Sequence, residues 1–113
     1  MTGTTKMVSW PNSESYVCFA QVHMEGLSGS CSIILMLNYY VSNGLVKAMY
    51  RDKDCKTVST KLGYYTSNEE INWSVVMDGY TMTVSTDKEK MTPYTWSWMN
   101  TTVPIYFKHG VYV

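Results

Sequence analysis

The sequence predicts an all-β protein built as an antiparallel β-sandwich, and three observations support that class. Apolar and polar residues alternate with period two through most of the 113 residues, as in strands that bury one face. Turn-forming residues interrupt these runs about every 8 to 12 residues. No segment carries an apolar stripe with the 3.6-residue period of a helix. We therefore expect one domain over residues 1–113, made of short strands joined by tight turns.

Three strands are predicted in the first half of the chain. Residues 17–24 form the first, and strict alternation gives it two faces. One face carries Cys18, Ala20, Val22 and Met24, and the other carries Phe19, Gln21 and His23. Residues 32–41 form the second strand, which ends at the turn signal Ser42-Asn43-Gly44. Residues 45–51 form the third, and a charged turn over residues 52–54 follows it.

A hairpin and a terminal strand are predicted in the second half. Residues 71–77 and 80–86 flank an Asp78-Gly79 pair, which favours a type I′ turn. The side chains predicted to face the core of this hairpin are Ile71, Trp73, Val75, Met77, Tyr80, Met82 and Val84. A solvated charge run over 87–90 and an aromatic loop between Pro93 and Pro104 come next. The last strand, 105–113, has Tyr106, Lys108, Gly110 and Tyr112 on one face, with Ile105, Phe107, His109, Val111 and Val113 toward the core.

Charge and hydropathy exclude several classes of partner. The net charge is zero and the pI is about 6.7, so no bulk charge attracts a nucleic-acid backbone. The longest aliphatic run, Ile33 to Leu37, is far shorter than the ~20 residues that cross a bilayer. We expect neither a nucleic-acid nor a membrane partner. The first ten residues contain no apolar segment of a signal peptide, which would fit removal of a leader or a start downstream of it.

The three cysteines, Cys18, Cys31 and Cys55, allow at most one intramolecular disulfide and leave one thiol. Their pairing is open from the sequence. Their spacing matches no zinc pattern, and the chain has only two histidines. We therefore predict no metal and no cofactor.

Two strand faces carry polar residues where apolar ones would be expected. Gln21 and His23 lie two residues apart, so a strand places them side by side. Tyr106, Lys108 and Tyr112 form the second polar face, with a glycine between the last two. Each face alone has an ordinary explanation, because solvent faces are polar and lysines protect sheet edges.

Taken together, the two motifs resemble the alginate lyases of polysaccharide lyase family 7. Gln21-Val22-His23 resembles that family's Gln-(Ile/Val)-His strand, and the run from Tyr106 to Tyr112 resembles its Tyr-Phe-Lys-Ala-Gly-x-Tyr strand. Residues 45–50 and 73–79 also resemble the family's intervening strands, so the resemblance spans about residues 17–112. It implies a jelly roll of the concanavalin-like kind, with both motifs on its concave sheet.

The resemblance implies β-elimination on a uronic-acid polymer. Gln21 would neutralise the carboxylate next to C5, since an amide donor stabilises charge that develops in the transition state. His23 would assist it or act as base. Tyr112 would protonate the O4 leaving group, and for mannuronate it would also be the base. Lys108 would lower the pKa of Tyr112 and bind substrate. The family's mechanism requires no metal.

Three further side chains are candidate substrate ligands. Tyr106 shares the face of Lys108, and Lys47 shares a face with Arg51 on the strand 45–51. Lys47 and Arg51 would line the groove, although a solvated edge explains them equally well. The expected partner is an anionic polysaccharide.

Departures from the family pattern predict an incomplete catalytic set. The family has an Arg-x-Glu-x-Arg strand upstream of Gln-x-His, whereas the single arginine here, Arg51, stands elsewhere. The chain also ends at Val113, directly after Tyr112, and His109 replaces a small residue. We expect a C-terminal portion of a secreted lyase that lacks the first strands of the jelly roll and keeps three of the four catalytic residue types.

The leading hypothesis is an alginate lyase or a related polyuronate lyase, such as a glucuronan lyase. The alternative is a non-catalytic, carbohydrate-binding sandwich derived from a lyase, and a third is a structural sandwich with two coincidental motifs. In having valine at the middle position of the Gln-x-His motif, the chain resembles the family members that prefer mannuronate-rich substrate. The sequence leaves open the polymer, endo or exo action and the oligomeric state.

Overall fold

The computed structural model describes residues 2–6, 16–24, 33–52, 54–78, 81–95 and 105–112. Side chains are described for these residues except Thr2, Met24 and all of the last strand other than Phe107. The strands are β1 (Thr2–Lys6), β2 (Tyr16–Met24), β3 (Ile33–Tyr40), β4 (Leu45–Arg51), β5 (Thr57–Tyr64), β6 (Glu70–Asp78), β7 (Thr81–Thr86), β8 (Tyr94–Thr95) and β9 (Ile105–Tyr112). Within the described ranges every regular element is a strand, as the sequence predicts.

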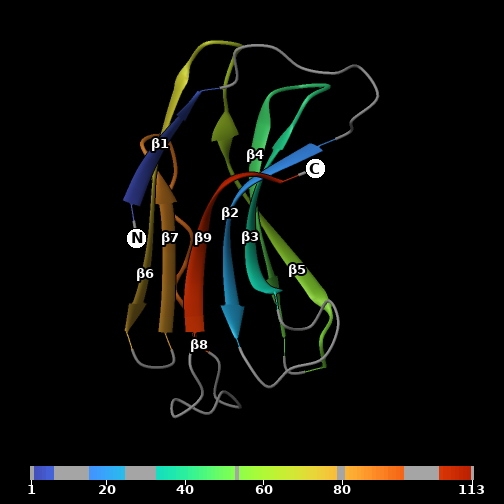
Figure 1. The fold of residues 1–113 in the computed structure, drawn as a ribbon, viewed down its shortest axis with the longest axis vertical. Coiled ribbons are helices and arrows are strands. Elements are labelled where there is room, and N and C mark those ends of the chain that lie inside the picture. The colour runs from blue at the N-terminus through green and yellow to red at the C-terminus, as the bar shows by residue number, and fades with distance from the viewer. Residues whose placement is uncertain are drawn as a thin grey trace.

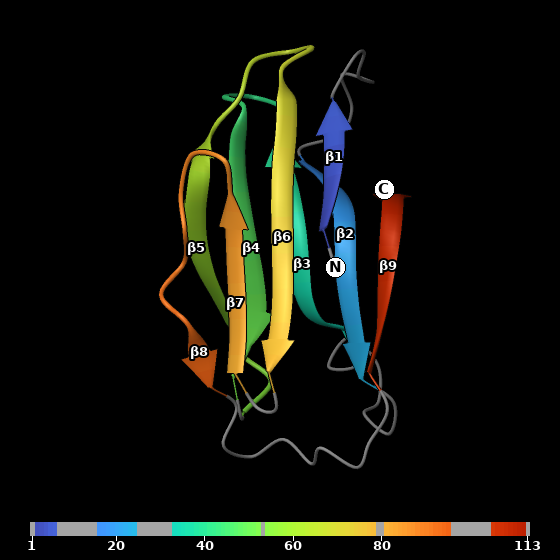
Figure 2. The ribbon, with the colours of Figure 1, turned by 90° about the vertical axis from the view of Figure 1, so that its left-hand side faces the viewer.

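Two antiparallel sheets lie face to face (Figure 1). One has four strands in the order β1-β6-β7-β8, and the other has five in the order β5-β4-β3-β2-β9. Figure 2 shows the smaller sheet in front of the larger one, with β9 at the outer edge beside β2. The antiparallel β-sandwich predicted from the sequence is therefore confirmed.

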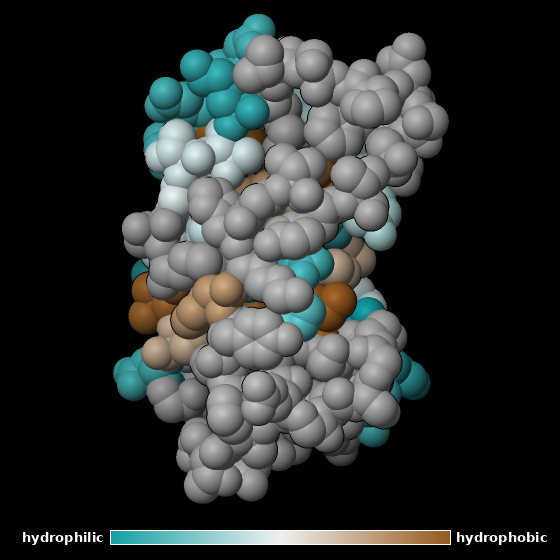
Figure 3. Space-filling view, in the orientation of Figure 1, coloured by the Kyte–Doolittle hydropathy of each residue, from teal (hydrophilic) through white to brown (hydrophobic). Residues whose placement is uncertain are grey.

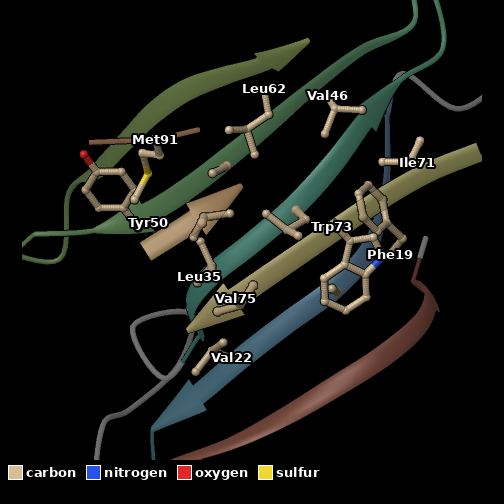
Figure 4. Packing of buried hydrophobic residues seen from close by; sticks show 14 of the residues in the cluster. Phe19, Val22, Leu35, Val46, Tyr50, Leu62, Ile71, Trp73, Val75 and Met91 are labelled. Carbon is tan, nitrogen blue, oxygen red and sulfur yellow. The ribbon is translucent and has the colours of Figure 1, made fainter. Parts of the chain in front are cut away.

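The core fills the space between the two sheets. Apolar side chains of β2, β3 and β4 meet those of β6 and β7 there (Figure 4). Phe19 of β2 contacts Trp73 of β6 with ring centroids 6.1 Å apart, and the indole Nε1 donates a hydrogen bond to Thr5 Oγ1 at 3.1 Å. This aromatic pair joins the two sheets, since the rings come from opposite layers.

A β-bulge in β2 changes which residues share a face. Between Cys18 and Ala20, strand β2 advances two residues while its partner β3 advances one, from Asn38 to Leu37. A bulge inserts an extra residue and reverses the alternation beyond it. Phe19 therefore enters the core together with Ala20 and Val22. The prediction that Phe19 shares the face of Gln21 was wrong, and Cys18 lies on that outer face instead.

The register of the β6–β7 hairpin differs by one residue from the sequence prediction. Asp78 pairs with Thr81, so it belongs to the strand and is not a central turn residue. The type I′ turn was predicted with Asp78-Gly79 at its centre, and Gly79 and Tyr80 lie outside the described residues. The predicted inward faces are otherwise confirmed: Ile71, Trp73, Val75, Met82 and Val84 are buried, and Met77 packs against the core.

Strand β5 was not predicted, because its composition is mostly polar. Of its eight residues only Leu62 is fully buried. β5 forms an edge of the larger sheet, where one side of the strand has no neighbour among the described strands, so few of its residues need to be apolar.

The turn after β3 follows the sequence prediction. Gly44 has φ = 74°, and a Cβ there would lie 2.1 Å from the carbonyl oxygen of Tyr65, so glycine is required. Asn43 Oδ1 accepts a hydrogen bond from the Leu45 amide at 3.1 Å. Residues 87–90 are exposed, as the charge run predicts.

The inner side of β9 is only partly covered. Phe107 pairs with Val22, a core residue, yet 39% of its surface is exposed. The expectation that Phe107 is buried was wrong, because β9 lies at the edge of the five-stranded sheet, beyond the span of the smaller sheet (Figure 2).

Hydrophilic and hydrophobic residues gather in different regions of the surface. In Figure 3 hydrophilic residues gather where β5 runs into β6, and hydrophobic ones appear at mid-height. Thr66, Ser67 and Asn68 of that connection are exposed. The described residues include no helix long and apolar enough to cross a membrane.

A buried tyrosine, Tyr65, ties the end of β5 in the larger sheet to the turn after β7 in the smaller one. The Tyr65 hydroxyl donates a hydrogen bond to Asp87 Oδ1 at 2.5 Å, and Lys88 Nζ lies 4.2 Å from the ring centroid. Burial and the Asp87 carboxylate raise the pKa of Tyr65 from 10.0 to about 12. Between pH 10 and about 12, the folded protein therefore keeps the phenolic proton of Tyr65, whereas the unfolded chain loses it. Tyr65 stabilises the fold fully below pH 10, and this contribution declines as the pH rises toward 12.

Replacing Tyr65 with phenylalanine is expected to lower the free energy of unfolding by about 1.5 kcal/mol at neutral pH, because a hydrogen bond to a carboxylate is lost. The difference from wild type should shrink as the pH rises from 10 toward 12. Urea unfolding at neutral pH and again between pH 10 and 12 measures this difference in unfolding free energy. The control is Tyr64→Phe, at an exposed tyrosine. A difference that grows with pH would contradict this role.

Candidate active site

The candidate site occupies the outer face of the five-stranded sheet, on the side away from the core. Strands β2 and β9 bend away from the smaller sheet toward one end, which makes this face concave (Figure 1). Gln21 and His23 lie on it in β2 and are only 9% and 8% exposed. They are polar side chains held in a largely desolvated setting, where electrostatic interactions are stronger than in water.

Strands β2 and β9 are direct neighbours, and their register aligns the two motifs. Gln21 pairs with Lys108, and His23 pairs with Tyr106. Residues opposite each other in an antiparallel pair occupy the same face of the sheet. The prediction that the two polar motifs meet across one sheet is confirmed at the level of the backbone, although they are 83 or more residues apart in sequence.

Tyr112 reaches this face one step further along β9, where it pairs with Cys18. Between this pair and the pair Ala20–His109, strand β9 has one more residue than β2. His109 pairs with Ala20, a core residue, as expected for a packing position. The backbone register thus places Lys108 opposite Gln21 and Tyr112 opposite Cys18.

Gln21 and His23 are hydrogen-bonded to each other. His23 Nε2 lies 2.7 Å from Gln21 Oε1, and an amide oxygen can only accept. In this arrangement His23 carries its proton on Nε2, so Nδ1 is the basic nitrogen of the neutral ring. The same bond orients the amide of Gln21, whose NH₂ group is a donor suited to a carboxylate.

Lys47 and Arg51 lie on the same outer face but two strands from β2. Lys47 Nζ stands 4.9 Å from the centroid of the Tyr40 ring. Arg51 Nη1 donates to Thr57 Oγ1 at 2.5 Å and approaches the Cys55 carbonyl at 3.5 Å. These contacts hold the guanidinium at the β4–β5 edge, so Arg51 is not brought beside Gln21 and His23.

Asn38 of β3 is a residue of this face that the sequence analysis missed. It pairs with Cys18 on one side and with Lys47 on the other, and it is fully buried. Its Nδ2 lies 3.0 Å from Met49 Sδ, whereas its Oδ1 has no hydrogen-bond partner among the described residues. Buried polar atoms are nearly always paired. A single asparagine in the otherwise apolar stretch of β3 was the available signal.

The described cysteines include one in a disulfide and one free thiol, which is consistent with a total of three cysteines. Cys55 is disulfide-bonded, and Cys18 is a free, buried thiol on the candidate face. Its Sγ donates to the Ala20 carbonyl at 3.3 Å. Burial raises the pKa of Cys18, against the opposing effect of hydrogen bonds with Gln21 and the backbone. The thiol is therefore neutral at physiological pH and serves as a small packing group beside Gln21.

Comparison with known proteins assigns the family. A family model described as alginate lyase matches residues 1–113, the whole of the chain. The chain belongs to this alginate lyase family. No curated protein matches it significantly in sequence.

Solved structures of alginate lyases share the fold of this family member. The alginate lyase PA1167 from Pseudomonas aeruginosa superposes with a TM-score of 0.84 at 19% identity, covering 99% of this chain and 53% of that one. Alginate lyase AlyC3 gives 0.81 at 18% identity, with 99% and 56% covered. The family 7 alginate lyase A1-II′, solved with a product, gives 0.76 at 18% identity, with 99% and 51% covered.

These matches confirm the jelly-roll architecture expected from the sequence. They also show that this alginate lyase family chain spans about half the length of the solved structures it matches. Trp96 and Trp98, in the aromatic loop predicted between Pro93 and Pro104, lie outside the described residues.

Proposed function

We propose that residues 1–113 are a lyase domain, or part of one, that cleaves alginate or a related polyuronate by β-elimination. The observation that carries this proposal is the β2–β9 register, which sets Gln21 opposite Lys108 and His23 opposite Tyr106 on one concave face. Family membership supports the reaction class. A non-catalytic binding role gains no support from any particular contact.

In the proposed reaction, the C5–H bond of a uronate breaks, a C4=C5 double bond forms and the C4–O4 bond breaks. The amide of Gln21 donates to the substrate carboxylate and so stabilises the charge that develops as C5 loses its proton. His23, fixed by its 2.7 Å bond to Gln21, assists this neutralisation or takes the proton on Nδ1. The geometry of this pair supports both roles.

Tyr112 is the proposed proton donor to O4 and, for mannuronate, also the base. Lys108 lies four residues earlier on β9, opposite Gln21, where an ammonium group would lower the pKa of a nearby phenol. Tyr106, opposite His23, is the proposed neighbouring contact to the sugar. Lys47 and Arg51 would bind more distant parts of the polymer.

The arginine of the family's Arg-x-Glu-x-Arg strand has no counterpart among the described residues of the face. Arg51 does not replace it, because its guanidinium contacts Thr57 and the Cys55 carbonyl two strands away. We propose that the active protein contains a further strand that supplies this cation, and that it is secreted.

A substitution at Gln21 tests the proposed function. Gln21→Leu keeps the approximate volume but removes the amide donor, so kcat/KM on alginate should fall about 100-fold. The rise in ultraviolet absorbance from unsaturated uronate ends measures the rate. Asn72→Leu, an exposed amide on the opposite sheet, is the matched control and should stay close to wild type.

Equal rates for Gln21→Leu and wild type would overturn this role of Gln21. Retention of wild type by alginate without any rise in absorbance would instead favour the non-catalytic alternative.

A further inference from the structure

Two lysines face each other directly on the candidate face. Lys47 of β4 pairs with Lys61 of β5 in the antiparallel register, so both occupy the outer side of the sheet. Like charges directly opposite each other destabilise a sheet. Among the described residues neither lysine has a carboxylate within ion-pair distance. In the part of the chain that the structure describes, no carboxylate therefore offsets this repulsion.

An aromatic pair adjoins Lys47. Lys47 Nζ lies 4.9 Å from the ring centroid of Tyr40, and Tyr16 lies against Tyr40 with centroids 5.6 Å apart. Tyr16 is 43% exposed. A cation beside such rings suits an acidic sugar, because the exposed Tyr16 ring and the half-buried Tyr40 ring can pack on C–H faces while the ammonium binds the carboxylate.

The unpaired oxygen of Asn38 lies at the same level of the sheet. Asn38 pairs with Lys47 across β3 and β4, and its buried Oδ1 has no hydrogen-bond partner in the part of the chain that the structure describes. Asn38 therefore adds an unpaired polar oxygen to the face that carries Lys47, while the Lys47 ammonium itself stands beside the Tyr40 ring.

We propose that Lys47 and Lys61 form a second carboxylate-binding subsite, which holds a uronate away from the one that reacts. At about 4.8 Å per strand, β4 and β5 lie roughly 10 and 14 Å from β2. This separation requires a different sugar of the same polymer. The inference rests on the proposed function for its substrate class, and it adds Lys61, Asn38, Tyr40 and Tyr16 to the groove.

Charge-neutral variants test the subsite. Lys61→Gln should weaken binding to alginate about threefold, and Lys47→Gln with Lys61→Gln about tenfold, with a smaller effect at high salt. Retardation in an alginate-containing gel measures binding, with neutral dextran as the control polymer. The double variant should be at least as heat-stable as wild type, because a like-charge contact is removed.

Lys90→Gln is the matched control, an exposed lysine beyond β7, and should bind like wild type. Substrate length gives a second readout: the ratio of KM for the polymer to KM for a disaccharide-sized substrate should rise in the double variant. Unchanged retardation of the double variant, an equal loss in Lys90→Gln, or no retention of wild type would overturn the subsite.

The outcomes also separate this subsite from the proposed reaction. Product formation with normal binding by the double variant would remove the subsite and leave the lyase function. Weaker binding by the double variant, with no product from wild type, would support the subsite and remove the lyase function.

Discussion

Replacing Tyr112 with phenylalanine is expected to reduce the formation of unsaturated uronate ends about 1,000-fold or more. Phenylalanine keeps the ring but cannot donate a proton to O4, and general acid–base catalysis contributes about 10²- to 10⁴-fold. When the same phenol also removes the C5 proton, as proposed for mannuronate, both transfers fail together. The initial rate of absorbance increase on mannuronate-rich alginate measures the effect.

The control for this variant is Tyr64→Phe, at a tyrosine that is 54% exposed. Both variants should unfold at the temperature of wild type, so a lost rate reports chemistry and not stability. Undiminished activity of Tyr112→Phe would rule out the assignment of Tyr112 as proton donor.

Truncating Trp73 to alanine is expected to lower the free energy of unfolding by about 3–5 kcal/mol. Trp73 is 3% exposed, contacts Phe19 of the opposite sheet and donates to Thr5. Removal of the indole leaves a cavity between the sheets and breaks the bond to β1. Because a small domain is stable by only about 5–15 kcal/mol, this loss would leave it close to unfolding at 25 °C.

Val76→Ala is the matched control, since Val76 lies on the same strand but is 52% exposed. It should change the unfolding free energy by less than about 0.5 kcal/mol. Chemical denaturation of both variants gives the comparison, and equal losses would contradict the placement of Trp73 at the centre of the sandwich.

The sequence was sufficient for the fold class because the strands that build the core carry clear alternation. β4 and the inward residues of the β6–β7 hairpin follow that pattern directly. β5 escaped prediction because a strand at the sheet edge buries little and its residues are mostly polar. A bulge has no period of its own, so the position of Phe19 in the core emerged only from the β2–β3 register.

The candidate site was predictable in part, because Gln21 and His23 stand out as polar residues in a strand. That Lys108 lies opposite Gln21 depends on which strands pair, and pairing is a property of the whole sheet. Lys61 could not be found in advance for the same reason, because it is an ordinary exposed lysine until its cross-strand neighbour is known. Asn38 gave a signal as the single asparagine of β3, but its place on the face emerged only from its cross-strand neighbours Cys18 and Lys47.

The most direct test of the central claim, that the face shared by β2 and β9 supports elimination, is mass spectrometry of the fragments that the protein releases from alginate. Elimination leaves an unsaturated uronate at the new non-reducing end, so that fragment is lighter by one water than the hydrolysis product. We predict fragments with unsaturated ends from wild type and almost none from Tyr112→Phe. Saturated fragments, or the same unsaturated fragments from both proteins at equal rates, would contradict the account.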